Sequence, residues 1–170
     1  MAQHVRRLDR IIAPDYVDGV DGRSLDELRT MERECLEVET EVSYVRRLAQ
    51  GRIDILEAER DRRAAGGALG DLIAALPQIL AGDSGRSDPA DVRVQPVLAP
   101  PASIEWNRGL ERLISDATLA NLPNITDAEL QATVEQLRQL EREVSDQRRG
   151  VHASLDAVAR AIAVQLAQAG

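Results

Sequence analysis

Hydrophobic residues recur every seven positions in two long segments of the chain, and this spacing constrains the fold more than any other feature. In the first segment, one heptad position is occupied by Leu28, Cys35, Val42, Ala49 and Leu56. The position three residues later is occupied by Met31, Val38 and Val45. The second segment repeats the period with Leu130, Leu137, Val144, Val151 and Val158. Such repeats are typical of coiled coils, in which each helix buries a narrow apolar seam. The sequence therefore predicts an all-α fold.

Both segments begin with the same helix-start signal. Ser24 with Glu27, and Thr126 with Glu129, form the capping box in which a hydroxyl and a carboxylate satisfy the first backbone N–H groups. We therefore expect four parts: an N-terminal segment with a short helix and a loop (1–23), a long helix (24–65), short helices with a flexible linker rich in Pro, Gly and Ser (66–125), and a second long helix (126–168).

The composition supports a slender helical bundle and argues against several functions. Aromatic residues make up 2% of the chain, too few for a large globular core. The net charge of -8 disfavours direct DNA binding and suits a basic protein partner. Without an 18-residue apolar stretch or a signal peptide, we expect a cytoplasmic protein with no membrane span. Gly-rich phosphate loops, HExxH and paired Cys and His sets are missing, so we expect no enzyme.

The second long segment repeats the first at an offset of 102 residues, and the repeat includes polar residues. "ETEVSYVRRLAQGRID" starts at Glu39 and aligns with "EREVSDQRRGVHASLD", which starts at Glu141. One polar stripe therefore consists of Glu39, Ser43, Arg46, Gln50 and Asp54, and the other of Glu141, Ser145, Arg148, His152 and Asp156. Only Gln50 and His152 differ in type, so a shared role for the stripes is a reasonable hypothesis.

Helix geometry places each stripe beside the seam. At about 100° per residue, the five positions fall within a sector of roughly 80°, about a quarter-turn from the seam. A parallel pair of helices would put the stripes on opposite faces. An antiparallel pair puts them on the same face with their centres level, and we favour this arrangement.

The stripes offer chemistry that suits a guanine nucleotide, although a purely structural interpretation remains open. Arginine can fork onto guanine O6 and N7 or pair with a phosphate, and a carboxylate can accept from the N1 and N2 edge. Alternatively, the polar residues form ordinary pairs along a solvated helix surface in a coiled-coil adaptor that binds no ligand. The occurrence of the stripe in two copies favours the binding hypothesis. An enzyme that acts on nucleotides is a weaker third hypothesis.

The twice-repeated pattern E-x3-S-x2-R-x3-Q-x3-D resembles the cyclic di-GMP signature of the RsiG anti-sigma factors of actinobacteria. The resemblance implies a long two-helix antiparallel coiled coil that binds a dimer of cyclic di-GMP across both motifs. It also implies that the loaded protein holds a sporulation sigma factor of the WhiG type, related to flagellar sigma factors, away from RNA polymerase. This chain departs from the signature at His152, where a pH dependence becomes possible. For the sigma-binding surface we would look at the short helices between residues 68 and 120, at Trp106 and at the acidic outer face.

Overall fold

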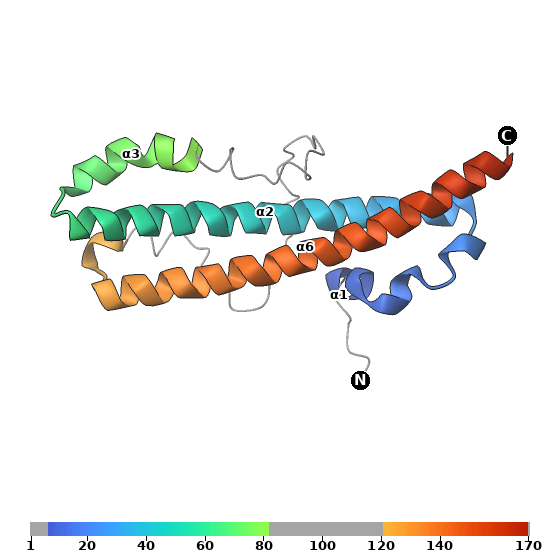
Figure 1. Ribbon diagram of the computed structural model, residues 1–170, viewed down its shortest axis with the longest axis horizontal. Helices are drawn as coiled ribbons and strands as arrows, with labels where there is room; N and C mark the ends of the chain where they lie inside the picture. The colour runs from blue at the N-terminus through green and yellow to red at the C-terminus, as the bar shows by residue number, and fades with distance from the viewer. Residues whose placement is uncertain (1–6, 82–120, 170) are drawn as a thin grey trace. The chain divides into compact units, whose positions relative to one another are not determined.

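The computed structural model describes residues 7–81 and 121–169, and helices account for nearly all of this part of the chain (Figure 1). The elements, in order, are α1 (Arg7–Ile12), the 3-10 helices η1 (Pro14–Val17) and η2 (Val20–Gly22), α2 (Leu25–Ala64), α3 (Leu69–Ala81), η5 (Leu122–Asn124) and α6 (Asp127–Ala169). The expected Pro-rich linker and the expected helix around Trp106 lie outside the described residues.

The two predicted seams form the buried core of α2 and α6. Every seam residue named above is at most 7% exposed, and most are below 2%. The only cysteine, Cys35, is one of these fully buried core residues. The prediction of an all-α protein built on two long packed helices is confirmed.

The chain forms two compact units, each of which contains a part of both long helices. The first unit comprises residues 1–44 and 143–170, and the second comprises residues 45–142. In the first, Leu28 and Met31 of α2 pack with Val158 and Ala161 of α6, while Arg148 meets α2 at Glu39. Higher α2 numbers pair with lower α6 numbers, so the helices are antiparallel.

The second unit has the same antiparallel order. Glu141 contacts α2 at Arg46 and Gln50, Arg138 contacts Glu57, and Asp127 contacts Arg63. The predicted antiparallel pairing is therefore confirmed within each unit.

Both long helices begin with the predicted capping box. The Oγ and backbone N–H of Ser24 donate to Glu27 Oε2 at 2.6 and 2.8 Å. The corresponding atoms of Thr126 donate to Glu129 Oε2, both at 2.8 Å. These hydrogen bonds lower the carboxyl pKa of Glu27 and Glu129, since each favours the charged form.

The N-terminal segment packs onto the first unit through α1 (Figure 1, blue). Ile11 is fully buried, and its carbonyl accepts a hydrogen bond of 2.7 Å from Ser154 Oγ on α6. Gly150 allows this close approach, because a Cβ there would lie 3.0 Å from Ile12 Cγ2. Arg7 reaches Glu37 and Glu41 on α2. The short helix is therefore held by both long helices.

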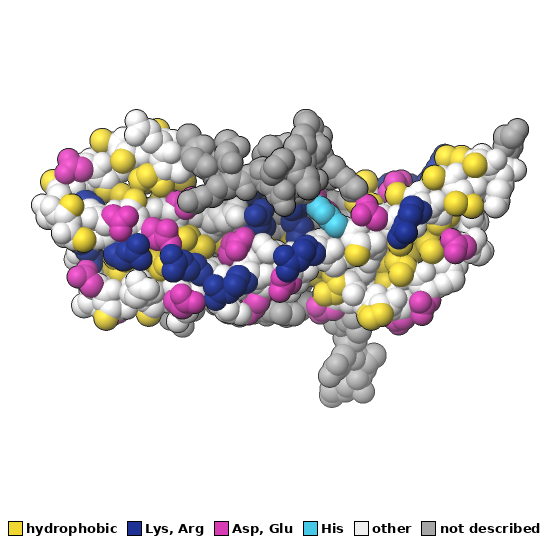
Figure 2. All heavy atoms as spheres, viewed as in Figure 1, with side chains coloured by type: hydrophobic (Ala, Val, Ile, Leu, Met, Phe, Trp, Pro, Cys, Tyr) yellow, Lys and Arg dark blue, Asp and Glu magenta, His cyan; other side chains and the backbone are white. Residues whose placement is uncertain are grey.

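In the second unit, α2 ends in a turn that reverses the chain into α3 (Figure 1, green). Gly66 has a φ of +68°, a left-handed conformation that favours glycine at a helix C-terminus. Leu72 of α3 is buried, whereas Ile73 and Leu80 are 61% and 48% exposed. Figure 2 shows hydrophobic side chains at the surface of α3.

A pair of polar contacts shows that the repeat extends beyond the caps. In the second unit, Arg63 of α2 donates to the carbonyl of Ile125, and in the first, Gln165 of α6 donates to the carbonyl of Arg23. The donor residues Arg63 and Gln165 are 102 positions apart, and so are the acceptor residues Arg23 and Ile125. The 3-10 helices η2 and η5 are related by the same offset. Each long helix therefore binds, near its own C-terminus, the segment that leads into the other.

Candidate functional site

In the first unit, residues of both stripes gather around the carboxylate of Glu39. Arg148 Nε donates to Glu39 Oε1 at 3.0 Å, and His152 Nε2 lies 3.3 Å from the same oxygen. Ser43 Oγ donates to that oxygen at 2.7 Å and accepts from Arg148 Nε at 2.9 Å. This cluster, the Glu39 half-site, joins the start of the first stripe to the later part of the second.

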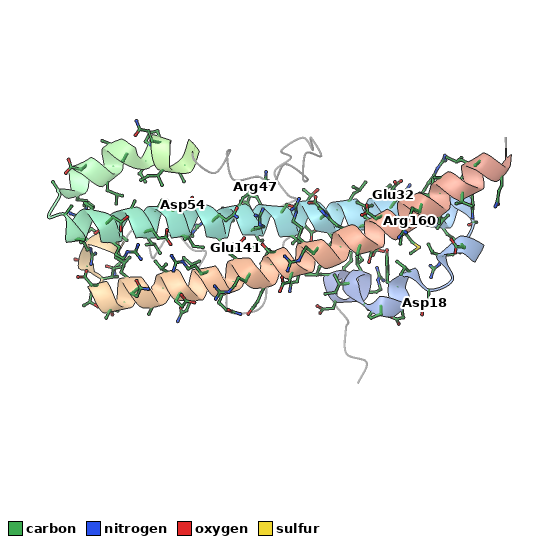
Figure 3. The ribbon with its side chains drawn as sticks, in the orientation of Figure 1. Asp18, Glu32, Arg47, Asp54, Glu141 and Arg160 are labelled. Carbon is green, nitrogen blue, oxygen red and sulfur yellow. The ribbon has the colours of Figure 1, made fainter. Side chains whose placement is uncertain are left out.

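The second unit contains the corresponding arrangement around Glu141. Arg46 Nε donates to Glu141 Oε1 at 3.1 Å, and Gln50 Nε2 donates to the same oxygen at 3.3 Å. We call this cluster the Glu141 half-site. Figure 3 shows Glu141 on the side of α6 that faces α2.

Each half-site thus combines a glutamate from one stripe with the arginine and the following amide or imidazole from the other. Sequence reasoning identified the stripe residues but did not predict this exchange between helices. The 102-residue offset relates the two clusters to each other, since it converts the Arg148–Glu39 contact into the Arg46–Glu141 contact, but it does not give the register between the helices. The exchange means that one stripe does not by itself form one half-site.

Burial distinguishes the two glutamates. The side chain of Glu39 is 4% exposed and that of Glu141 is 23% exposed. Burial by itself raises the pKa of Glu39, but the hydrogen bonds from Ser43, Arg148 and His152 outweigh it and lower this pKa below the ordinary value. Glu39 is therefore a buried anion that three side chains stabilise.

Three further stripe residues lie on the same two long helices. Ser145, Asp54 and Asp156 each take part in a polar interaction in the structure. Asp54 is partly buried on α2 (Figure 3), and Asp156 is exposed on α6. The half-sites therefore bring together seven of the ten predicted residues.

In the first unit, α1 and the stripe residues lie on opposite flanks of the α2 seam. At about 100° per residue, Glu37 and Glu41, which α1 contacts, fall roughly 90° to one side of the seam. Glu39 and Ser43 fall roughly 90° to the other side. The docked helix therefore contacts the other flank of α2, away from Glu39 and Ser43.

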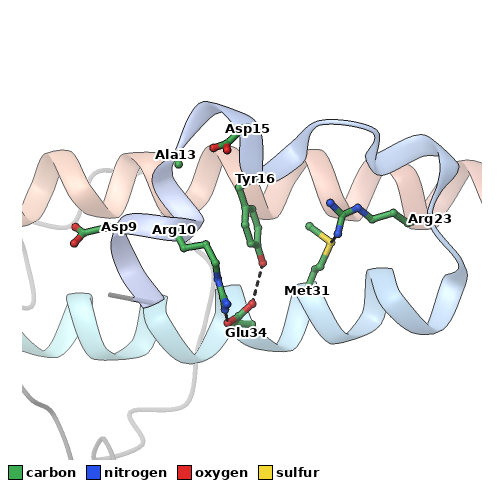
Figure 4. A pocket seen from close by; sticks show the side chains of 8 residues that line it. All are labelled: Asp9, Arg10, Ala13, Asp15, Tyr16, Arg23, Met31 and Glu34. Carbon is green, nitrogen blue, oxygen red and sulfur yellow. Dashed lines mark hydrogen bonds and ion pairs between the residues drawn. The ribbon is translucent and has the colours of Figure 1, made fainter. Parts of the chain in front are cut away.

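A separate hollow of about 570 Å³ lies on the α1 side of the first unit (Figure 4). Tyr16 Oη donates to Glu34 Oε2 at 3.2 Å across it, and Arg10 pairs with the same carboxylate. Burial raises the pKa of Tyr16 far above its ordinary value. These polar groups already stabilise the docked segment, so the hollow is a weaker candidate than the half-sites.

Among residues 7–81 and 121–169, no cluster of three or more His, Cys, Asp or Glu side chains is arranged to hold a metal ion. The helices of the same two ranges include none that is both long and apolar enough to cross a bilayer.

Comparison with known protein families gives a match to the model described as RsiG-like, over residues 14–80. The matched segment contains the first stripe and its cap. This finding confirms the resemblance that the repeated motif indicates, and it points to an anti-sigma factor role. No curated protein matches the chain.

Proposed function

We propose that this chain, whose residues 14–80 match the RsiG-like family, is an anti-sigma factor regulated by cyclic di-GMP. In this proposal a dimer of cyclic di-GMP binds across the two stripes. The loaded protein then sequesters a sporulation sigma factor of the WhiG class and blocks transcription. Release of the nucleotide frees the sigma factor.

The observation that carries the proposal is the matched chemistry of the two half-sites. Each has one glutamate and one arginine from different helices, joined through Nε at 3.0 Å in one unit and 3.1 Å in the other. A two-fold symmetric ligand needs two copies of the same set of groups. An unrelated solvated surface has no reason to repeat them.

The polar groups suit the proposed ligand. In both ion pairs Nε donates to the glutamate, and an arginine is a side chain that can bind guanine O6 and N7 or a phosphate oxygen. Glutamate can accept from the guanine N1 and N2 edge. The glutamates would thereby hold the arginines in position before the ligand arrives, which reduces the cost of ordering them on binding.

The sigma factor requires a surface outside the half-sites. The net charge of -8 suits a partner with a basic, nucleic-acid-binding surface. The exposed side chains Ile73 and Leu80 on α3 add apolar area of the kind that protein partners cover. We therefore propose α3 as the first candidate surface for contacts with the sigma factor.

A titration of paired variants by calorimetry tests the ligand proposal. Arg148 contributes to the Glu39 half-site, whereas its neighbour Arg149 is 76% exposed and pairs with Asp146 on its own helix. We expect Arg148→Ala to weaken cyclic di-GMP binding at least about a hundredfold, as for a charge-assisted bidentate contact, and Arg149→Ala to bind as the wild type does. Equal affinity in the two variants would refute a role for the half-site.

A coiled-coil adaptor without a ligand is the second candidate, and one observation favours it. The half-site residues hydrogen-bond one another, as they would in a purely structural network. A pull-down separates the two candidates when it uses a variant with replacements at Ser43, Arg46, Ser145 and Arg148. If the chain is an adaptor, this variant still binds its partner. The same variant of a nucleotide-dependent anti-sigma factor releases its partner even when cyclic di-GMP is present.

A further inference from the structure

We propose that His152 makes nucleotide binding at the Glu39 half-site proton-dependent, so that the chain binds its ligand more tightly as the pH falls through neutrality. This inference rests on the proposed function and adds a regulation to it. It concerns the one position at which the two stripes differ in residue type.

His152 and Gln50 occupy equivalent positions in the two half-sites. His152 Nε2 lies 3.3 Å from Glu39 Oε1, and Gln50 Nε2 lies 3.3 Å from Glu141 Oε1. The imidazole therefore occupies the place of the amide and presents a nitrogen to the same kind of oxygen. An amide cannot change its charge, whereas an imidazole is the side chain that ordinarily takes up a proton between about pH 5 and 8.

The charged groups around the imidazole define its response. From α2 it faces the carboxylate of Glu39 and the neutral hydroxyl of Ser43. On its own helix, Arg148 and Asp156 are one turn away on either side, and Arg149 is paired with Asp146. The charged side chains Arg7 and Arg10 of α1 reach Glu37, Glu41 and Glu34, on the other flank of α2.

Of the side-chain types around this position, imidazole is the one that ordinarily changes charge near neutrality. The pKa of Glu39 is lowered by its hydrogen bonds, despite its burial, so this carboxylate stays ionised above the acidic range. Arginine stays protonated throughout. A change in affinity between pH 6 and 8 that depends on this position therefore reports the imidazole.

The charge of the ligand gives the direction of the effect. Every cyclic di-GMP molecule carries two phosphodiester charges, so a bound dimer would bring four negative charges to the stripes, where they act over about one Debye length. These negative charges favour the imidazolium, so the bound protein takes up protons more readily than the free protein. By linkage, protons must then strengthen nucleotide binding by the same factor.

Calorimetry at constant ionic strength tests the inference with a matched pair of variants. We expect the wild type to bind cyclic di-GMP at least about fivefold more tightly at pH 6.0 than at pH 8.0. His152→Gln gives the Glu39 half-site the same amide that Gln50 provides in the Glu141 half-site, and it should abolish most of this difference in affinity. Gln50→His gives both half-sites an imidazole and should increase the difference in affinity between pH 6.0 and pH 8.0. Repeating the wild-type titration in buffers of different ionisation enthalpy should reveal proton uptake, which His152→Gln lacks.

The outcomes separate this inference from the proposed function. A wild type that binds cyclic di-GMP equally well at pH 6.0 and 8.0, or a His152→Gln variant that keeps the full pH dependence, overturns the proton linkage and leaves the proposed function intact. A wild type that binds no cyclic di-GMP at either pH overturns both.

Discussion

At the scale of the residue, Glu59 is the most deeply buried charged side chain outside the half-sites in the part of the chain that the structure describes. Its side chain is 0% exposed and accepts from Arg62 at 2.6 and 2.8 Å and from Arg63 at 2.6 Å. The hydrogen bonds from Arg62, followed by those from Arg63, lower its pKa below the ordinary 4.5, although burial opposes them. Glu59 therefore stabilises the fold in its ionised form.

The pH dependence of unfolding tests this role of Glu59. Because its folded-state pKa is depressed, its stabilisation is fully present above about pH 4.5 and is lost as the pH falls through the lower folded-state value. In urea unfolding, Glu59→Gln should be less stable than the wild type at pH 7, and the difference should shrink toward pH 3. Asp61→Asn, at a 74% exposed carboxylate, is the control and should leave the curve nearly unchanged. A constant difference across this range would contradict the assignment.

Gly150 is a second residue whose identity the packing requires. A Cβ there would lie 3.0 and 3.2 Å from Ile12 Cγ2 and Cβ, so Gly150→Leu should displace α1 from α6. Hydrogen exchange should then speed up for residues 8–12, while the amides of the α6 seam stay protected. Gly70→Leu, where a Cβ meets nothing within 4 Å, is the control. Unchanged exchange in α1 would show that the contact does not hold it.

At the scale of the element, the two capping boxes offer a matched pair of predictions. Removal of an N-cap hydroxyl typically costs about 1 kcal/mol. We expect Ser24→Ala and Thr126→Ala each to lower the free energy of unfolding by about this amount, because the two caps have nearly the same geometry. Urea denaturation measures both. A loss below about 0.3 kcal/mol in either variant would mean that its cap is not formed in solution.

Much at this scale could be predicted from the sequence. Heptad spacing identified the seam residues that are buried, such as Cys35 and Val151, and the caps gave the helix starts. Periodicity determines which face of a helix is apolar but not which residue of the other helix lies opposite. Contacts such as Arg148 with Glu39 therefore required the structure, as did the docking of α1, which depends on the missing side chain of Gly150.

At the scale of the whole molecule, the internal repeat unites fold and proposed function. The same offset of 102 residues relates the caps, the seams, the half-sites and the contacts that Arg63 and Gln165 make with backbone carbonyls. The repeat is imperfect at two informative places. Gln50 corresponds to His152, and the buried Glu59 corresponds to Ala161. The first difference bears on ligand binding and the second on stability.

We propose that the two stripes together form one binding site for cyclic di-GMP. A calorimetric titration of the full chain tests it most directly. We predict saturable binding with about two nucleotides per chain, and loss of that binding in Arg46→Ala as well as in Arg148→Ala, because each arginine belongs to a different half-site. Absence of heat and of any thermal stabilisation by the nucleotide would contradict the account, as would full binding by either arginine variant.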